Sequence, residues 1–121
     1  MTDFASVGQQ FVNHYYSSFK DKAALAGLYT DQSLLTYEGE QFMGVEAIMG
    51  KLSGLPNIDF DATNAVTDFQ PSVNEGIFAM INCSMAIDGG QPLRFTQTFL
   101  LQKGGEAGYY VHNEVFRLSL G

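Results

Sequence analysis

The spacing of hydrophobic residues changes near residue 57, and this change constrains the fold more than any other feature of the sequence. In the first segment, apolar side chains recur every three or four residues, at Phe4, Val7, Phe11, Val12, Tyr15 and Phe19. From Ile58 almost to the C-terminus, they recur at every second residue. The first spacing is typical of an amphipathic helix and the second of half-buried strands. We therefore expect helices followed by a long sheet, which is an α+β order.

The N-terminal part divides into elements that the spacing and the flanking residues define. Its predicted helices cover residues 4–19, 22–29 and 45–55, and a small pair of strands covers residues 33–38 and 41–43. Thr2 and Asp3 precede the first helix and belong to the residue types that commonly cap helix N-termini. Pro56 ends the third helix, and Gly39 provides the turn between the two short strands. All three helices thus precede the long sheet and are expected to pack on one of its faces.

The second half predicts four long strands joined as an antiparallel meander. The second strand, residues 77–88, is the most informative, because one of its faces is wholly apolar: Ile77, Ala79, Ile81, Cys83, Met85 and Ile87. We expect this face to look into the core. The following strands should continue it with Leu93, Phe95, Phe99, Leu101, Phe116, Leu118 and Leu120.

The opposite face of the predicted sheet also carries apolar side chains, which are Phe78, Met80, Thr98 and Val115, with Arg117 beside them. A mixed face that water covers is one interpretation. However, no further helix is predicted that could cover these residues, and contiguous exposed apolar patches commonly mark interfaces. A sheet face packed on its twofold mate is self-complementary. We therefore expect a homodimer formed through this face.

Length and cysteine content limit the kind of domain and its compartment. A chain of 121 residues with one cysteine, Cys83, is expected to form a single domain over residues 1–121 without disulfide bonds. No apolar run approaches the roughly 20 residues of a membrane-spanning helix. Residues 1–10 contain no Lys or Arg of the kind that begins a signal peptide. These features favour a reducing compartment, the cytosol or the nucleus.

The charge of the chain limits its partners. The formal net charge is -7 at pH 7, which repels nucleic acid and anionic lipid. The surplus lies between residues 32 and 93, where Lys51 alone stands against Glu38, Glu40, Glu46, Asp59, Asp61, Asp68, Glu75 and Asp88. We therefore expect a basic protein partner, and neither nucleic acid nor a membrane.

Several motifs resemble a known family when they are taken together. They are HYY at 14–16, LTYEG at 35–39, KLSGLP at 51–56, QTFLL at 97–101 and NEVFRL at 113–118. Their order and spacing are similar to those of the nuclear transport factor 2 family, over about residues 4–120. The resemblance implies a homodimer of cone-shaped subunits. In each subunit a strongly bent antiparallel sheet wraps a long helix, and a hydrophobic cavity lies at the open end.

The resemblance also implies a function that is not enzymatic and needs neither a cofactor nor a metal. Nuclear transport factor 2 carries the GDP-bound form of the small GTPase Ran into the nucleus, and it binds Phe-rich repeats of nuclear pore proteins. A protein of this kind is expected in cytoplasm and nucleus, concentrated at the nuclear pore.

Individual site residues follow from the same resemblance. An aromatic side chain of Ran would enter a cavity walled by Tyr37, Leu55, Phe60 and Phe116. Carboxylates of Glu38 and Asp88 on the cavity rim would pair with basic residues of Ran. An apolar anchor supplies affinity, whereas rim charges select the partner. The alternative is that the apolar residues are ordinary core and that the acids are turn residues in water.

The sequence departs from the family pattern at two places. The family commonly has a second rim acid where this chain has Gly90 and Gln91, so a neighbour such as Asp61 would have to replace it. The family usually places a Trp at the repeat-binding site near the N-terminus, but this chain contains no Trp. Phe4 stands at the matching position and could contact a Phe of a repeat, because such a contact needs only an apolar ring. Core packing of Phe4 is an equal alternative.

Two other classes of function remain open. Small isomerases and dehydratases share the fold, and the period of two puts His112 and Glu114 in phase with Phe116, facing Tyr15. Such a set could move a proton in an apolar pocket, although a solvent-exposed His and Glu near a strand end is the simpler interpretation. The third class is a protein-interaction domain that does not bind Ran.

Overall fold

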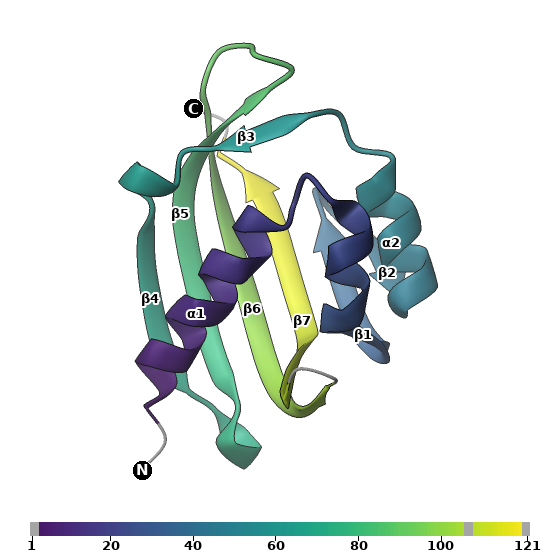
Figure 1. The fold of residues 1–121 in the computed structure, drawn as a ribbon, viewed down its shortest axis with the longest axis vertical. Helices are drawn as coiled ribbons and strands as arrows, with labels where there is room; N and C mark the ends of the chain where they lie inside the picture. The colour runs from purple at the N-terminus through teal and green to yellow at the C-terminus, as the bar shows by residue number, and fades with distance from the viewer. Residues whose placement is uncertain (1–2, 106–107, 120–121) are drawn as a thin grey trace.

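The computed structural model describes residues 3–105 and 108–119, and Figure 1 shows their arrangement. Its helices are α1 (Phe4–Ser17), η1 (Lys22–Leu28), α2 (Val45–Ser53), η2 (Ala62–Asn64) and η3 (Val73–Glu75), where η marks 3-10 turns. Its strands are β1 (Tyr29–Tyr37), β2 (Glu40–Met43), β3 (Ile58–Phe60), β4 (Val66–Pro71), β5 (Ile77–Ile87), β6 (Leu93–Gly105) and β7 (Gly108–Leu118). Within these residues no helix is long and apolar enough to cross a membrane.

The predicted first helix is present as α1, and its start is capped as expected. The Asp3 carboxylate accepts a hydrogen bond from the Ser6 amide at 3.1 Å, which satisfies a backbone donor that the helix leaves free. Thr2, the other candidate cap, and Leu120, a predicted inner-face residue, lie outside the described residues. The helix ends at Ser17 rather than at Phe19, yet the Phe19 ring is still buried. The second predicted helix is a 3-10 helix, η1, and the third is α2.

The strands form one mixed sheet in the order β2-β1-β7-β6-β5-β3, with β4 also paired to β5. The predicted antiparallel meander is present as β5, β6 and β7. The exception to antiparallel pairing is β1, which runs parallel to β7. Because most of the chain lies between these two strands, the connection is long enough for a parallel pair. The first predicted long strand is divided by η2 into β3 and β4, which pair with different halves of β5.

The two faces of the sheet have the predicted characters. On β5, the side chains of the predicted inner face from Ile77 to Met85 are 0–2% exposed. The prediction for Leu93 is wrong, since it is 39% exposed. It begins β6 beside the β5–β6 loop, at the end of the sheet. On the outer face, Phe78 and Met80 are each 41% exposed and Val115 is 45% exposed.

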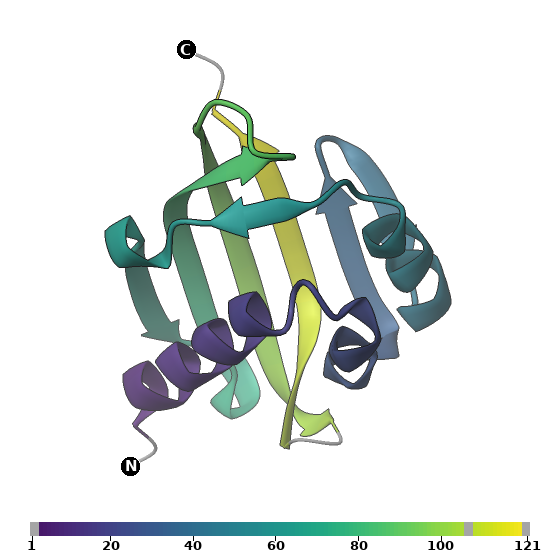
Figure 2. The same ribbon diagram turned by 45° about the horizontal axis from the view of Figure 1, so that its top comes forward.

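The helices α1, η1 and α2 lie on one side of the curved sheet (Figures 1 and 2). At Gly8, α1 approaches β4 so closely that a Cβ atom would lie 2.5 Å from Cδ1 of Phe69. At the other end of the sheet, the β1–β2 turn and the β5–β6 loop lie together at the top of Figure 2. This end, with β3 crossing in front of the sheet, is where the predicted rim residues lie.

Candidate functional site

A small, mostly apolar cavity lies between the helices and the inner face of the sheet. Its volume is about 10 Å³, and its lining residues are Tyr15, Phe19, Tyr37, Leu52, Ile58, Phe60, Gln97, Glu114 and Phe116. This volume is enough for about one water molecule. The predicted wall residues Tyr37, Phe60 and Phe116 line the cavity. Leu55 does not: it lies two residues beyond the end of α2, half-buried at the edge of the core.

Aromatic rings make up much of the lining of this cavity. Tyr37 stacks on Phe116 with a centroid separation of 4.6 Å and an interplanar angle of 4°. Phe116 in turn stacks on Phe95 at 5.0 Å. Phe60 lies 4.6 Å from the ring of Tyr16 and 5.6 Å from that of Phe95. The period of two in β6 and β7 and the amphipathic α1 bring these rings together, because each strand turns every second side chain inward.

The cavity floor carries a buried carboxylate, Glu114, which is 2% exposed. Its Oε1 accepts a hydrogen bond from the Tyr29 hydroxyl at 2.6 Å. Its Oε2 accepts hydrogen bonds from the Tyr15 hydroxyl at 3.0 Å and from Nε2 of Gln97 at 2.5 Å. The amide oxygen of Gln97 accepts from Tyr16 at 2.6 Å. The simpler interpretation of Glu114 as a solvent-exposed residue is therefore wrong.

Burial raises the pKa of the Glu114 carboxyl from its ordinary value of 4.5 to about 7, although its three hydrogen-bond donors act in the opposite direction. Desolvation and the nearby carboxylate raise the pKa values of Tyr15 and Tyr29 well above the ordinary range.

Gln97 and Tyr29 were not predicted as members of this site. A usable signal existed for Gln97, because it is the one polar residue in the inward phase between Phe95 and Phe99.

His112 does not join Tyr15 and Glu114, so the predicted catalytic set is only partly assembled. A register shift between Leu100 and Leu101 leaves His112 as an extra residue of β7, because Leu100 pairs with Asn113 and Leu101 pairs with Val111. A bulge of this kind reverses the phase of the strand beyond it. The His112 ring instead lies beside Tyr110, whose hydroxyl is 3.2 Å from Nδ1. Periodicity alone could not reveal the bulge.

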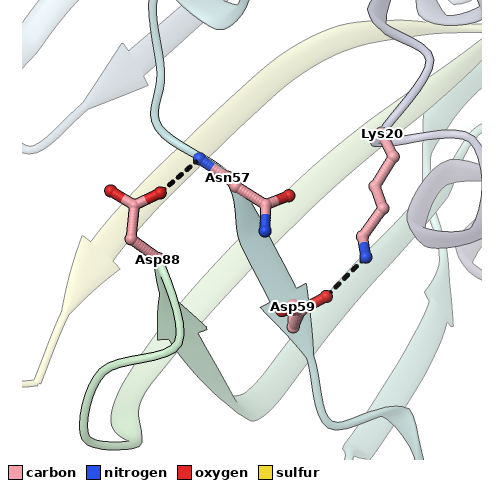
Figure 3. A network of polar contacts seen from close by, with 4 residues as sticks. All are labelled: Lys20, Asn57, Asp59 and Asp88. Carbon is pink, nitrogen blue, oxygen red and sulfur yellow. Dashed lines mark hydrogen bonds and ion pairs between the residues drawn. The ribbon is translucent and has the colours of Figure 1, made fainter.

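The predicted rim acids lie at the same end of the sheet and are each bonded to a neighbouring backbone. Glu38 forms the β1–β2 turn with φ 51°, and its carboxylate accepts from the Leu118 amide. Asp88 follows β5, also with φ 51°, and its Oδ1 accepts from the Asn57 amide at 3.2 Å (Figure 3). Among the described residues, neither acid forms a salt bridge.

Asp61 does not take the place of a second acid beside Asp88. Its amide donates to the Ser84 carbonyl at 2.9 Å, and its Oδ2 accepts from Nδ2 of Asn64 at 2.7 Å. Asp61 therefore closes the η2 turn. It lies four residues along the chain from Asn57, whose amide donates to Asp88. Asp59 lies nearer, but it is paired with Lys20 at 2.6 Å (Figure 3).

Lys51, the basic residue of the acidic stretch, lies at the cavity rim. Its Nζ is 5.1 Å from the ring centroid of Tyr37 and 5.7 Å from that of Phe42. It also pairs with Oε1 of Glu40 at 3.5 Å. The rim therefore carries one cation packed on an aromatic ring of the cavity as well as the predicted acids.

The outer sheet face presents the predicted dimer residues as a continuous row. Register places Met80 opposite Thr98, and Thr98 opposite Val115, across three neighbouring strands. Phe78 lies two residues from Met80 on the same face, and exposed Arg117 pairs in register with Thr96. At the far end of α1, Phe4 is half-buried and packs against the hydrophobic core.

A groove outside the cavity was not predicted. It lies between α1 and the β3–β4 region, with a volume of about 560 Å³. Its apolar lining is formed by Val12, Tyr16, Ile58, Phe60 and Ala65, and the ion-paired Lys20 and Asp59 also line it. Phe60 and Ile58 thus separate this groove from the smaller cavity.

The same arrangement of helices and curved sheet occurs in solved structures. The structure of nuclear transport factor 2 from Cryptosporidium parvum has a TM-score of 0.88 and 40% identity, covering 96% of this chain and 94% of that chain. A chain of the C. albicans Mtr2-Mex67 M domain complex has a TM-score of 0.85 at 14% identity, covering 96% of this chain and 94% of that chain, which shows the fold alone. These similarities place the chain in the class of nuclear transport factor 2-like folds.

Sequence comparison gives the family within that class. The family model described as the nuclear transport factor 2 (NTF2) domain matches residues 7–118. Relatives named nuclear transport factor 2 from Neurospora crassa and Oryza sativa subsp. japonica are 38% and 41% identical, each match covering 98% of this chain and 97% and 99% of the relatives. The chain belongs to the nuclear transport factor 2 family. The predicted family and fold class are confirmed, and these relatives are named as transport factors rather than as enzymes.

Proposed function

We propose that this protein is a nuclear import carrier that binds GDP-bound Ran and the Phe-rich repeats of nuclear pore proteins. It moves between cytoplasm and nucleus and concentrates at the nuclear pore. The names of its relatives support a role in nuclear transport. The observation that carries the proposal is the position of Glu38 and Asp88 at the end of the sheet where the aromatic wall of the cavity reaches the surface.

Ran recognition combines an apolar anchor with charge. An aromatic side chain of Ran packs among Tyr37, Phe60 and Phe116, while basic residues meet Glu38 and Asp88. Burial of an aromatic ring supplies most of the affinity, and charge complementarity speeds encounter and selects the partner. Leu55, at the end of α2, contacts the part of the partner that stays outside the cavity. The basic partner also fits the net charge of -7.

The carrier acts as a homodimer through the outer sheet face. Phe78, Met80 and Val115 expose 41–45% of their surface there, and a twofold axis through the row of Met80, Thr98 and Val115 would cover them with identical residues. Arg117 lies at the edge of this interface, where its stem can pack while its charge stays hydrated.

Phe-rich repeats bind at Phe4. This residue is only half-buried, so part of its ring is free to contact a Phe of a repeat. Its remaining surface packs against the core, which makes Phe4 a residue with both structural and binding roles.

The enzymatic alternative has one supporting observation and one against it. Tyr15 and Glu114 are hydrogen-bonded inside the cavity, as an acid–base pair would be. However, the cavity has room for about one water molecule beside them, and His112 lies outside it. The third class, a protein-interaction domain that does not bind Ran, is distinguished from the carrier by titration with Ran.

The test is calorimetric titration of the protein with GDP-loaded and GTP-loaded Ran. We expect binding of the GDP form, and at least tenfold weaker binding by Glu38→Lys and Asp88→Lys, which is about 1.4 kcal/mol. Glu46→Lys is the matched control, because Glu46 is an exposed acid in the first turn of α2. Equal affinity for both nucleotide forms, or no binding at all, would contradict the carrier function.

A further inference from the structure

The cavity and the guest proposed for it differ in size. The carrier function, on which this inference rests, requires an aromatic side chain to enter the cavity. The volume of about 10 Å³ admits roughly one water molecule, and an aromatic ring is several times larger. A lining side chain must therefore move before the guest can enter.

Exposure shows which lining side chains form the mouth of this cavity. Most of them are 4% exposed or less: Tyr15, Phe19, Leu52, Ile58, Gln97, Glu114 and Phe116. Tyr37 and Phe60 are only half-buried. Tyr37 ends β1 and Phe60 ends β3, and Phe60 also lines the larger groove, so the cavity comes nearest to the surface at these two rings.

The two rings at the mouth are held to different extents. Phe60 contacts three other rings, with centroid separations of 4.6 Å to Tyr16, 5.0 Å to Phe19 and 5.6 Å to Phe95. Among the residues that the structure describes, Tyr37 packs on one ring, that of Phe116, at 4.6 Å. Moving Tyr37 therefore breaks fewer ring contacts than moving Phe60.

Lys51 supplies a further contact with the Tyr37 ring. Its ammonium group lies 5.1 Å from the Tyr37 ring centroid, within the range of a cation–π interaction. The Lys51 side chain is 27% exposed, and it also pairs with Glu40 at 3.5 Å. We propose that Tyr37 is the gate of the cavity and that Lys51 is a positioning residue that latches it, so that Lys51 determines how readily an aromatic ligand enters.

The latch also connects the cavity to the charged rim. Glu40, which tethers Lys51, lies two residues from the rim acid Glu38 across the β1–β2 turn. A basic group of a partner that approaches this turn competes with Lys51 for Glu40. Loss of that tether weakens the hold of Lys51 on Tyr37. The gate therefore opens more readily to an aromatic side chain that has a basic neighbour than to an isolated aromatic ligand.

Indole is a suitable probe of this gate. The chain contains no Trp, so emission excited beyond the tyrosine band reports the ligand alone. We expect Lys51→Met to bind indole about two to five times more tightly than wild type, the fold-change that corresponds to one exposed cation–π contact. Lys51→Arg should restore the wild-type affinity, because it keeps the cation. Lys103→Met is the matched control, since Lys103 pairs with Glu75 and does not line the cavity.

A second variant keeps the test independent of Lys51. Tyr37→Ala removes the gate itself, and we expect it to bind indole at least fivefold more tightly than wild type. The proposal is overturned if Lys51→Met and Lys103→Met bind indole equally, or if Tyr37→Ala gains no affinity. This assay uses indole and contains no Ran. A failure of the gate proposal therefore appears in the indole titration, and a failure of the carrier function appears in the Ran titration.

Discussion

Glu114 makes the stability of this protein depend on pH in an unusual direction. Its pKa is about 7 in the folded protein, against 4.5 for an ordinary glutamate. The folded state therefore binds the proton more tightly than the unfolded state does. A carboxyl group with a raised folded-state pKa contributes its stability fully below the unfolded value, and that contribution is lost as pH rises through the folded value.

The size of the effect follows from this difference. A rise of two to three pKa units, at about 1.4 kcal/mol for each, corresponds to about 3 kcal/mol. We expect the free energy of unfolding to fall by about this amount between pH 4.5 and pH 7 and to change little from this source above pH 7. Urea unfolding followed by far-ultraviolet circular dichroism, at half-unit steps of pH, measures the slope.

Glu114→Gln isolates the contribution of this carboxyl group. The variant has no titrating group at the cavity floor, so its free energy of unfolding should lack the fall of about 3 kcal/mol. Its amide faces donors from Tyr29, Tyr15 and Gln97, which lowers stability by a constant amount and leaves the slope unaffected. His14 and His112 are present in both proteins, so any contribution they make cancels. An identical pH dependence in the two proteins would refute the reasoning.

A second variant is available if Glu114→Gln does not fold. Tyr29→Phe removes the hydroxyl that donates to Glu114 at 2.6 Å. This hydrogen bond is the largest of the influences that lower the Glu114 pKa, so its loss should raise that pKa further. The fall in stability should then extend to higher pH than in wild type, and a fall that ends at the same pH would contradict the assignment.

Three further predictions concern the surface of the molecule. Val115→Glu should give monomers in sedimentation velocity, because a buried unpaired carboxylate costs several kcal/mol. The interface is ruled out if the wild type is already a monomer at tens of micromolar, a concentration range typical of weak association. Phe4→Ala should weaken binding of Phe-rich repeats while leaving Ran binding intact, whereas a large fall in Tm with unchanged repeat binding would make Phe4 a core residue. Asp3→Ala should lower the free energy of unfolding by about 1 kcal/mol through loss of the α1 cap, and equal urea midpoints would show that this cap is not needed.

Periodicity predicted those parts of the fold that local patterns determine. Two such parts are present as expected, the inward face of β5 from Ile77 to Met85 and the amphipathic α1. Buried positions recur at every second residue in β5 and at every third or fourth residue in α1. The pairing of β1 with β7 could not be predicted in this way, since a parallel pair of strands distant in sequence leaves no local signal. The bulge at His112 could not be predicted for a similar reason, because a single extra residue depends on the partner strand, and it reverses the phase of the strand beyond it.

The candidate site was predictable to a similar degree. The resemblance supplied Tyr37, Phe60 and Phe116, which do line the cavity. It also supplied Leu55, which does not line the cavity, because its position depends on how the chain leaves α2. The period of two placed Glu114 in the inward phase facing Tyr15, but the solvent-exposed interpretation was preferred because charged residues are almost never fully buried without a partner. Its donors come from α1, β1 and β6, and only the folded chain brings these elements together.

The geometry of the rim acids changes how their charge should be tested. Glu38 and Asp88 each accept a backbone hydrogen bond, from Leu118 and Asn57, and each has φ 51°. Replacement by Lys removes that hydrogen bond together with the charge, and so it alters the turns by about 1 kcal/mol. Glu38→Gln and Asp88→Asn keep the acceptor oxygen, and Asn tolerates a positive φ. We therefore expect the neutral variants to retain the wild-type Tm and yet bind GDP-bound Ran about three to ten times more weakly, which is about 0.7 to 1.4 kcal/mol. The loss should shrink in high salt, because these partly exposed charges are screened. If the neutral variants bind Ran as wild type does while the Lys variants do not, the turns rather than the charges carry recognition at this rim.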